Sequence, residues 1–334
     1  RSSAQGYTPV GVAAYRGDLE MLDCLVAAAA DVEKASLRGF TALHGAAHGN
    51  SAAVIGRLLE ARANLERTTV RAKTALCIAC EKGFSEVVRC LLDAGAEVEG
   101  CYGPSSTKKP APLLAAAEQG HVEVVDLLLQ RQAEVNRSSS RGFTALHAAA
   151  ENGQVPVMHQ LLAASAQLDC QAEGWTPLLS AVGNGHHEAV EVLLAAGALR
   201  SQAEAASALD VACRLGDCPV VRQLLDARAD PAATHALCSA ASGGYVEVVA
   251  LLLELSVDLE SAPDGLTPLC LASEAGHLEV VCRLLQARAQ LDSGPAAQQH
   301  GLATPAAALA QGAGHVEVMQ LLEQIARDRS CSGK

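Results

Sequence analysis

Some cysteines and histidines of this chain have the spacing of metal ligands. Cys77 and Cys80 form a Cys-x-x-Cys pair, which zinc sites commonly use, and further cysteines follow downstream. His44 and His48 are four residues apart, so a helix would place both imidazoles on one face. Either set could hold a metal ion, for structure or for hydrolysis.

Other catalytic signatures are incomplete. His186-His187-Glu188 lacks the second histidine of a zinc-protease helix. The sequence contains no phosphate-binding Gly-x-x-x-x-Gly-Lys loop and no dinucleotide-binding fingerprint, and no Ser/His/Asp set stands out. We therefore expect no catalytic residue, no metal ligand and no cofactor, and the chain is not expected to be an enzyme.

The elements that must position these residues recur along the chain. A Thr followed by Pro or Ala, usually with Leu next, returns at close to 33 residues, which is typical of stacked repeats. The ten units that we recognise are anchored at Thr8, Thr41, Thr74, Ala111, Thr144, Thr176, Ser207, His235, Thr267 and Thr304.

Each position of the repeat has a physical role. The hydroxyl caps a first helix, Pro fits its first turn, and small residues then allow close helix approach. Nine residues after the anchor a glycine suits the left-handed turn that ends this helix, and a second helix with apolar i, i+3, i+4 spacing follows. His44 and Cys77 occupy one shared position and Cys80 a small-residue position, so we predict core roles for them. We predict a structural role, and not a catalytic or metal-binding one, for the further histidines in repeated positions, namely His121, His147, His186, His277 and His315.

Over residues 6–326 this pattern resembles the ankyrin repeat. The resemblance implies an all-α solenoid of about ten helix-turn-helix units with hairpin-like loops projecting to one side. The repeats would start near residues 6, 39, 72, 109, 142, 174, 205, 233, 265 and 302. Residues 1–5 would be a lead-in, and the start at Arg1 indicates a trimmed chain; residues 327–334 would form a flexible tail.

Some units depart from the pattern. Insertions at 101–109 and 293–303 should lengthen two loops. The connector at 230–234 is too short for a full hairpin, which predicts a local change in curvature near residue 231. Ser207 and His235 replace the capping Thr in their units.

Composition and charge limit the partners and the compartment. The net charge of −12, from 25 basic and 37 acidic residues, argues against binding to nucleic acid or anionic membranes. No run of 18 apolar residues is present, so we expect no membrane insertion. Several of the twelve cysteines, such as Cys24, Cys90 and Cys282, fall in equivalent helix positions, as buried small hydrophobes would. We expect reduced thiols in a cytoplasmic, or else nuclear, monomer.

The residues that the repeat does not explain are aromatic or polar. Four aromatic residues directly precede the Thr position, which the resemblance places at the rim of a concave surface, and aromatics are favoured interface anchors. They could instead pack between loops and stabilise the stack, and a charged row is often only solvated. The predicted partner-binding residues are Tyr7, Tyr15, Phe40, His48, Lys73, Glu81, Lys82, Glu118, Gln119, Phe143, Glu151, Asn152, Trp175 and Asn184.

These observations predict a non-enzymatic scaffold that binds a protein or peptide partner on its concave and loop surface. The alternative is that the chain is the targeting or regulatory arm of a larger multidomain enzyme, ligase complex or channel.

Overall fold

The structure is a computed structural model that describes residues 6–100, 111–231, 235–255, 257–262, 265–293 and 304–332. These residues form twenty α-helices and no strand, apart from one isolated bridge between Ala172 and Trp175, so the predicted all-α class is confirmed. The chain divides into two compact units, residues 1–196 and 197–334.

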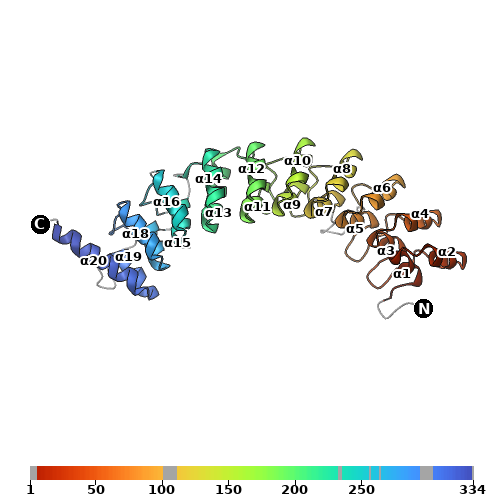
Figure 1. The fold of residues 1–334 in the computed structure, drawn as a ribbon, viewed down its shortest axis with the longest axis horizontal. Helices are drawn as coiled ribbons and strands as arrows, with labels where there is room; N and C mark the ends of the chain where they lie inside the picture. The colour runs from red at the N-terminus through yellow and green to blue at the C-terminus, as the bar shows by residue number, and fades with distance from the viewer. Residues whose placement is uncertain are drawn as a thin grey trace. The chain divides into compact units, whose positions relative to one another are not determined.

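The first unit holds six helix pairs in two rows (Figure 1). The first helices are α1 (Pro9–Arg16), α3 (Ala42–His48), α5 (Ala75–Lys82), α7 (Pro112–Gln119), α9 (Ala145–Glu151) and α11 (Pro177–Gly183). The second helices are α2 (Leu19–Ala27), α4 (Ala52–Glu60), α6 (Ser85–Asp93), α8 (Val122–Gln130), α10 (Val155–Ala163) and α12 (His187–Ala195). Each helix packs on the other helix of its own pair and on its counterpart in a neighbouring repeat of this unit.

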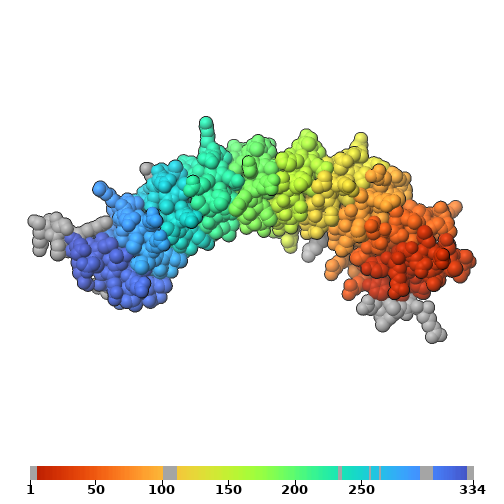
Figure 2. Space-filling view, in the orientation of Figure 1, coloured from red at the N-terminus to blue at the C-terminus, as the bar shows by residue number. Residues whose placement is uncertain are grey.

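The second unit repeats this plan four times. Its helices are α13 (Gln202–Leu215), α14 (Cys218–Asp226), α15 (Ala236–Gly243), α16 (Val246–Glu254), α17 (Pro268–Glu274), α18 (Leu278–Gln286), α19 (Pro305–Ala313) and α20 (Val316–Ser332). Within each unit, side chains fill the spaces between neighbouring ribbon helices (Figure 2).

Small residues set the close approach of the first helices. Ala46, Ala47, Ala116 and Ala149 are fully buried between repeats. The second helices contribute larger apolar side chains to the same core, as Leu58 does. Because one helix pair cannot cover its own apolar face, the repeats are stable only when stacked.

The predicted helix caps are confirmed. The hydroxyl of Thr8 accepts the backbone N–H of Gly11 at 3.0 Å, and Thr74, Thr144, Thr176, Thr267 and Thr304 act in the same way. At the other end of α1, Gly17 has a φ of +72°, the left-handed conformation expected of it.

The loops before the first helices are the predicted hairpin-like turns. The backbone N–H of Ser36 donates to the carbonyl of Phe40 at 2.8 Å, and Thr69 and Lys73 form the equivalent bond at 3.0 Å. The two loops are joined by a bond from Val70 N–H to the Arg38 carbonyl at 3.1 Å.

The predicted start of the seventh repeat near residue 205 is wrong. Helix α13 begins at Gln202 and its N-cap is Ser201, whose hydroxyl accepts the N–H of Glu204. Ser207 lies inside the helix and donates to the Ala203 carbonyl. The strong helix formers between Ser201 and Ser207, with no glycine or proline among them, extend the helix toward its N-terminus.

The predicted tail from residue 327 is helical through Ser332, because α20 continues past the end of the last repeat. An i, i+4 ion pair between Glu323 and Arg327 supports this extension.

Other predictions fall outside the described residues. These are the lead-in at 1–5, the insertion at 101–109, most of the insertion at 293–303, and the centre of the short connector at 232–234. The change in curvature at that connector remains a prediction. Among the helices that are described, none combines the length and the apolar character needed to cross a membrane.

Candidate functional site

The cysteine pair lies in the core, as predicted. Cys77 and Cys80 are 2% and 0% exposed on α5, and burial raises the pKa of both thiols. The backbone N–H of Cys77 donates to the Thr74 hydroxyl that caps this helix. Within the described part of the chain, no three His, Cys, Asp or Glu side chains are grouped so as to hold a metal ion.

The solvent exposure of Cys24 contradicts part of the prediction that the cysteines are buried. Cys24 is exposed and Cys90 and Cys282 are partly exposed, whereas Cys213 is buried. The position that Cys24 shares with Cys90 and Cys282 lies toward the outer side of the second helices. The spacing alone did not show which side of the helix it occupied.

His44 and His147 connect successive repeats. The backbone N–H of Thr41 donates to Nδ1 of His44 at 3.2 Å, and Nε2 lies 3.1 Å from the Lys73 carbonyl of the next loop. His147 makes the same bonds to Thr144 and to the Trp175 carbonyl. Burial lowers the pKa of His44 to about 4, and it also lowers that of His147. Both rings are structural bridges, as predicted.

The histidines that follow the glycines have a second structural role. Nε2 of His121 lies 3.1 Å from the Glu81 carbonyl at the end of the preceding first helix. His186 and His277 contact the carbonyls of Glu151 and Ser242 in the same way, at 2.9 and 3.0 Å. Their Nδ1 edges cover a glycine of the preceding repeat, and His315 packs equally on Gly276.

The rim aromatics divide into two groups. Phe40 and Phe143 are half-buried against His44 and His147, with ring centroids 5.7 and 5.4 Å apart. The edge of Trp175 lies over Gly183 although the side chain is 41% exposed. For these three residues the stabilising interpretation therefore holds at least in part.

Tyr7 and Tyr15 are more open, at 39% and 53% exposed. Tyr15 lies at the end of α1 and stacks obliquely on His48, with ring centroids 5.4 Å apart. Together with Phe40, they place aromatic surface around one hollow.

The polar candidates lie at or near the ends of the first helices. Lys73 and Glu81 form an ion pair, while Lys82 beside them is exposed. The side-chain amides of Asn152 and Asn184 donate to carbonyls of their own helices at 2.9 and 2.8 Å, so they serve as helix caps. Glu118, Gln119 and Glu151 are exposed.

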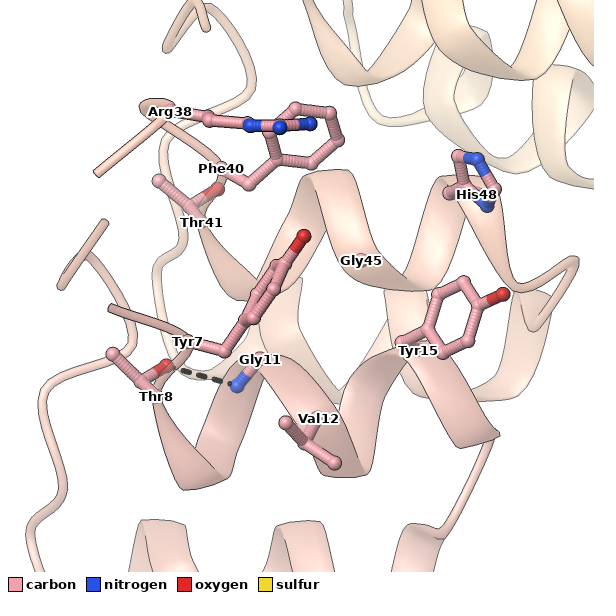
Figure 3. A pocket seen from close by; sticks show the side chains of 10 residues that line it. All are labelled: Tyr7, Thr8, Gly11, Val12, Tyr15, Arg38, Phe40, Thr41, Gly45 and His48. Atoms are coloured by element: carbon pink, nitrogen blue, oxygen red, sulfur yellow. Dashed lines mark hydrogen bonds between the residues drawn. The ribbon is translucent and has the colours of Figure 1, made fainter. Parts of the chain in front are cut away.

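Half of the predicted set meets in a groove over the first three repeats, here called the N-terminal groove. Its first hollow has a volume of about 410 Å³ and is lined by Tyr7, Thr8, Gly11, Val12, Tyr15, Arg38, Phe40, Thr41, Gly45 and His48. Figure 3 shows Arg38 and Phe40 at one end of this hollow and Tyr15 and His48 at the other.

A second hollow of about 230 Å³ continues the groove toward α5. It shares Arg38, Phe40 and His48 with the first hollow. Its other lining residues are Thr69, Val70, Arg71, Lys73, Ile78, Glu81 and Lys82. Glu118, Gln119, Phe143, Glu151, Asn152, Trp175 and Asn184 do not line either hollow.

Sequence reasoning missed the floor of the groove. Gly11 stands three residues after Thr8, where other repeats have His44, Cys77 or His147. Without a side chain there or at Gly45, the two helices leave a hollow between the aromatic walls. The glycine in a position otherwise held by larger residues was the available signal.

These features define a class of protein, and comparison with known families agrees. A family model described as ankyrin repeats (3 copies) matches residues 10–100, 100–172, 160–235 and 209–294. The chain therefore belongs to the ankyrin-repeat family.

Some of the similar proteins are much longer chains, and the similarity covers only a small part of their length. Mouse protein fem-1 homolog A-like is 38% identical over 82 residues, which are 25% of this chain and 12% of that protein. The ankyrin repeat and KH domain-containing protein mask-1 of Caenorhabditis elegans is 33% identical over 172 residues, 48% of this chain and 6% of that protein. The crystal structure of the human ASB11 ankyrin repeat domain superposes with a TM-score of 0.61 at 28% identity, covering 68% of this chain and all of that one.

Proposed function

We propose that this protein is a non-enzymatic scaffold that binds a protein partner through its first helices and the loops before them. The observation that carries the proposal is the N-terminal groove, where aromatic side chains that the repeat does not require surround an open hollow. Exposed aromatics of this kind are favoured anchors at protein interfaces. The ankyrin-repeat family, whose members generally mediate protein–protein interaction, supports the same conclusion.

Capture of partners from a native cell lysate, followed by mass spectrometry, tests this proposal. The variant Tyr7→Ala, Tyr15→Ala, Phe40→Ala and Trp175→Ala should lose the captured proteins, because it removes the exposed aromatic surface of the rim. Circular dichroism should show unchanged helicity.

A matched variant removes four exposed apolar side chains from second helices instead: Met21→Ala, Val122→Ala, Leu278→Ala and Val316→Ala. It should capture the same proteins as the wild type. Equal capture by both variants, or equal loss, would show that the rim is not the binding surface.

The alternative is that the chain is the targeting or regulatory arm of a larger enzyme, ligase complex or channel. It is favoured by the relatives, of whose length this chain covers only 12% and 6%. The full-length transcript distinguishes the two, since a further domain of recognisable chemistry would assign the repeats to that larger protein.

We also propose a monomer that works in the cytoplasm or nucleus and does not bind nucleic acid. The net charge of −12 supports this, as do ten cysteines of the described ranges that are not joined in disulfides. Light scattering and a fluorescent fusion would measure the mass and the compartment.

A further inference from the structure

The N-terminal groove has a different charge from the chain that carries it. The whole chain has a net charge of −12, yet the charged residues lining the groove are Arg38, Arg71, Lys73, Lys82 and a single acid, Glu81. Glu81 is already paired with Lys73. Arg38, Arg71 and Lys82 are all exposed and have no ion-pair partner within the described ranges. The groove is therefore a local basic site on an acidic protein.

The same groove exposes apolar side chains. Tyr7, Val12 and Tyr15 around the first hollow are 39%, 38% and 53% exposed, and Val70 in the second is 72% exposed. Large apolar side chains that are exposed together mark interaction surfaces more often than isolated ones do. An occupant should therefore combine negative charge with apolar groups.

His48, which lines both hollows, has an unsatisfied polar atom. Its Nδ1 is buried and has no hydrogen-bond partner among the residues that the structure describes. By contrast, Nδ1 of His44 and of His147 accepts a backbone N–H. A buried nitrogen without a partner destabilises the protein, so a ligand that reorders this ring could restore a bond.

The dimensions of the groove fit an extended chain. The two hollows share three lining residues and run from α1 across α3 to α5. With neighbouring helices about 8–10 Å apart, this path is roughly 20 Å long. An extended peptide covers that length with about six residues.

We propose that the N-terminal groove binds an extended acidic segment of a protein partner. One large apolar side chain of the segment occupies the first hollow between Tyr7, Tyr15 and Phe40, and carboxylates beside it in the second hollow lie near Arg38, Arg71 and Lys82. This inference rests on the proposed scaffold function and names the kind of segment that the scaffold recognises.

Fluorescence polarisation with designed peptides tests the inference on the whole chain. The probe is a labelled peptide with one phenylalanine flanked on both sides by glutamates. Control peptides replace the glutamates by glutamines or by lysines, or the phenylalanine by alanine. We expect the glutamate–phenylalanine peptide to bind about tenfold more tightly than each control. Its affinity should also fall as the ionic strength rises from about 0.01 to 0.15 M, where the Debye length shortens from about 30 to 8 Å.

A charge-reversal variant checks the location. Arg71→Glu with Lys82→Glu should weaken binding of the glutamate–phenylalanine peptide about tenfold or more. The control variant Arg89→Glu changes an exposed cation of α6 that lines neither hollow, and it should leave the affinity unchanged. Circular dichroism confirms that each variant remains helical.

Several outcomes would overturn the inference. They are equal binding of the acidic, neutral and basic peptides, or full affinity in the Arg71→Glu, Lys82→Glu variant. If no peptide binds while lysate partners are still lost with the rim aromatics, the acidic segment is wrong and the scaffold function stands. If the acidic peptide binds while lysate capture does not depend on the rim, the segment is right and the wider binding surface is wrong.

Discussion

At the scale of single residues, His44 shows how a potential catalytic group becomes structural. Its two ring nitrogens contact Thr41 at the start of its own helix and the Lys73 carbonyl of the next loop. A ring that accepts from an N–H at Nδ1 and faces a carbonyl at Nε2 must be neutral with its proton on Nε2. The neutral form is thus part of the fold.

This bridge predicts a dependence of stability on pH. The pKa of His44 is about 4 in the folded protein against 6.5 as the ordinary value, so the unfolded chain binds the proton first as the pH falls. This stabilisation is fully present above pH 6.5 and is lost as the pH falls from there to 4; at pH 5 the loss is about 2 kcal/mol. Urea denaturation at pH 7, 6 and 5 measures the loss.

The variant His44→Gln is the control for this prediction, since it retains a polar side chain without the titration. It should start less stable at pH 7 and lose less stability between pH 7 and pH 5 than the wild type. His147 titrates in both proteins and cancels from the comparison. Parallel curves for the two proteins would show that His44 does not carry the effect.

The sequence predicted the roles of residues whose hydrogen bonds are local or whose positions recur in each repeat. It did not predict the solvent exposure of single side chains. Thr144 caps a helix whose sequence lies directly beside it, and Cys80 falls where small residues recur. Cys24 was misjudged because its exposure depends on which neighbouring helices cover its side of α2, and the spacing in the sequence does not show that.

At the scale of elements, the contact between α1 and α3 depends on a glycine. A Cβ at Gly45 would lie 2.8 Å from the carbonyl oxygen of Gly11, so the two helix backbones could not remain at their present distance. The variant Gly45→Ala should lower the free energy of unfolding by about 1–3 kcal/mol, the usual effect of overpacking. It should also narrow the first hollow of the groove.

Gly56 provides the matched substitution. It lies inside α4, is exposed, and a Cβ there would have no atom within 4 Å. Gly56→Ala should therefore stabilise the protein by about 0.5–1 kcal/mol, because alanine loses less conformational freedom in a helix. Urea denaturation measures the free energy of unfolding of both variants. A Gly45→Ala protein as stable as the Gly56→Ala protein would refute the close contact between α1 and α3.

Element boundaries were predictable where the repeat supplies its own stop signals. Gly17 ends α1 and Thr74 begins α5, as the pattern indicated. The start of α13 was not predictable from the repeat, because Ser201 lies outside the regular register and helix propensity decides there. The groove was only half predicted, since the aromatic walls stand out in the sequence whereas a hollow appears only when α1 and α3 are packed together.

At the scale of the whole molecule, stability is additive along the stack. Helix contacts in the first unit run between successive repeats, for example from α1 to α3 and from α3 to α5. In such a chain the free energy of folding is a sum of unfavourable single repeats and favourable neighbour interfaces, so a minimum of about three repeats is needed.

This additivity predicts how fragments behave. A fragment of residues 1–200, which contains the six helix pairs of the first unit, should fold with a cooperative urea transition and strong helical circular dichroism. Its exposed last repeat should reduce solubility, because interior repeats lack a polar outer face. A fragment of residues 1–61 has only α1 to α4 and should remain largely unfolded, since one neighbour interface cannot offset the entropy of ordering two repeats. A folded short fragment, or an unfolded long one, would contradict nearest-neighbour stabilisation.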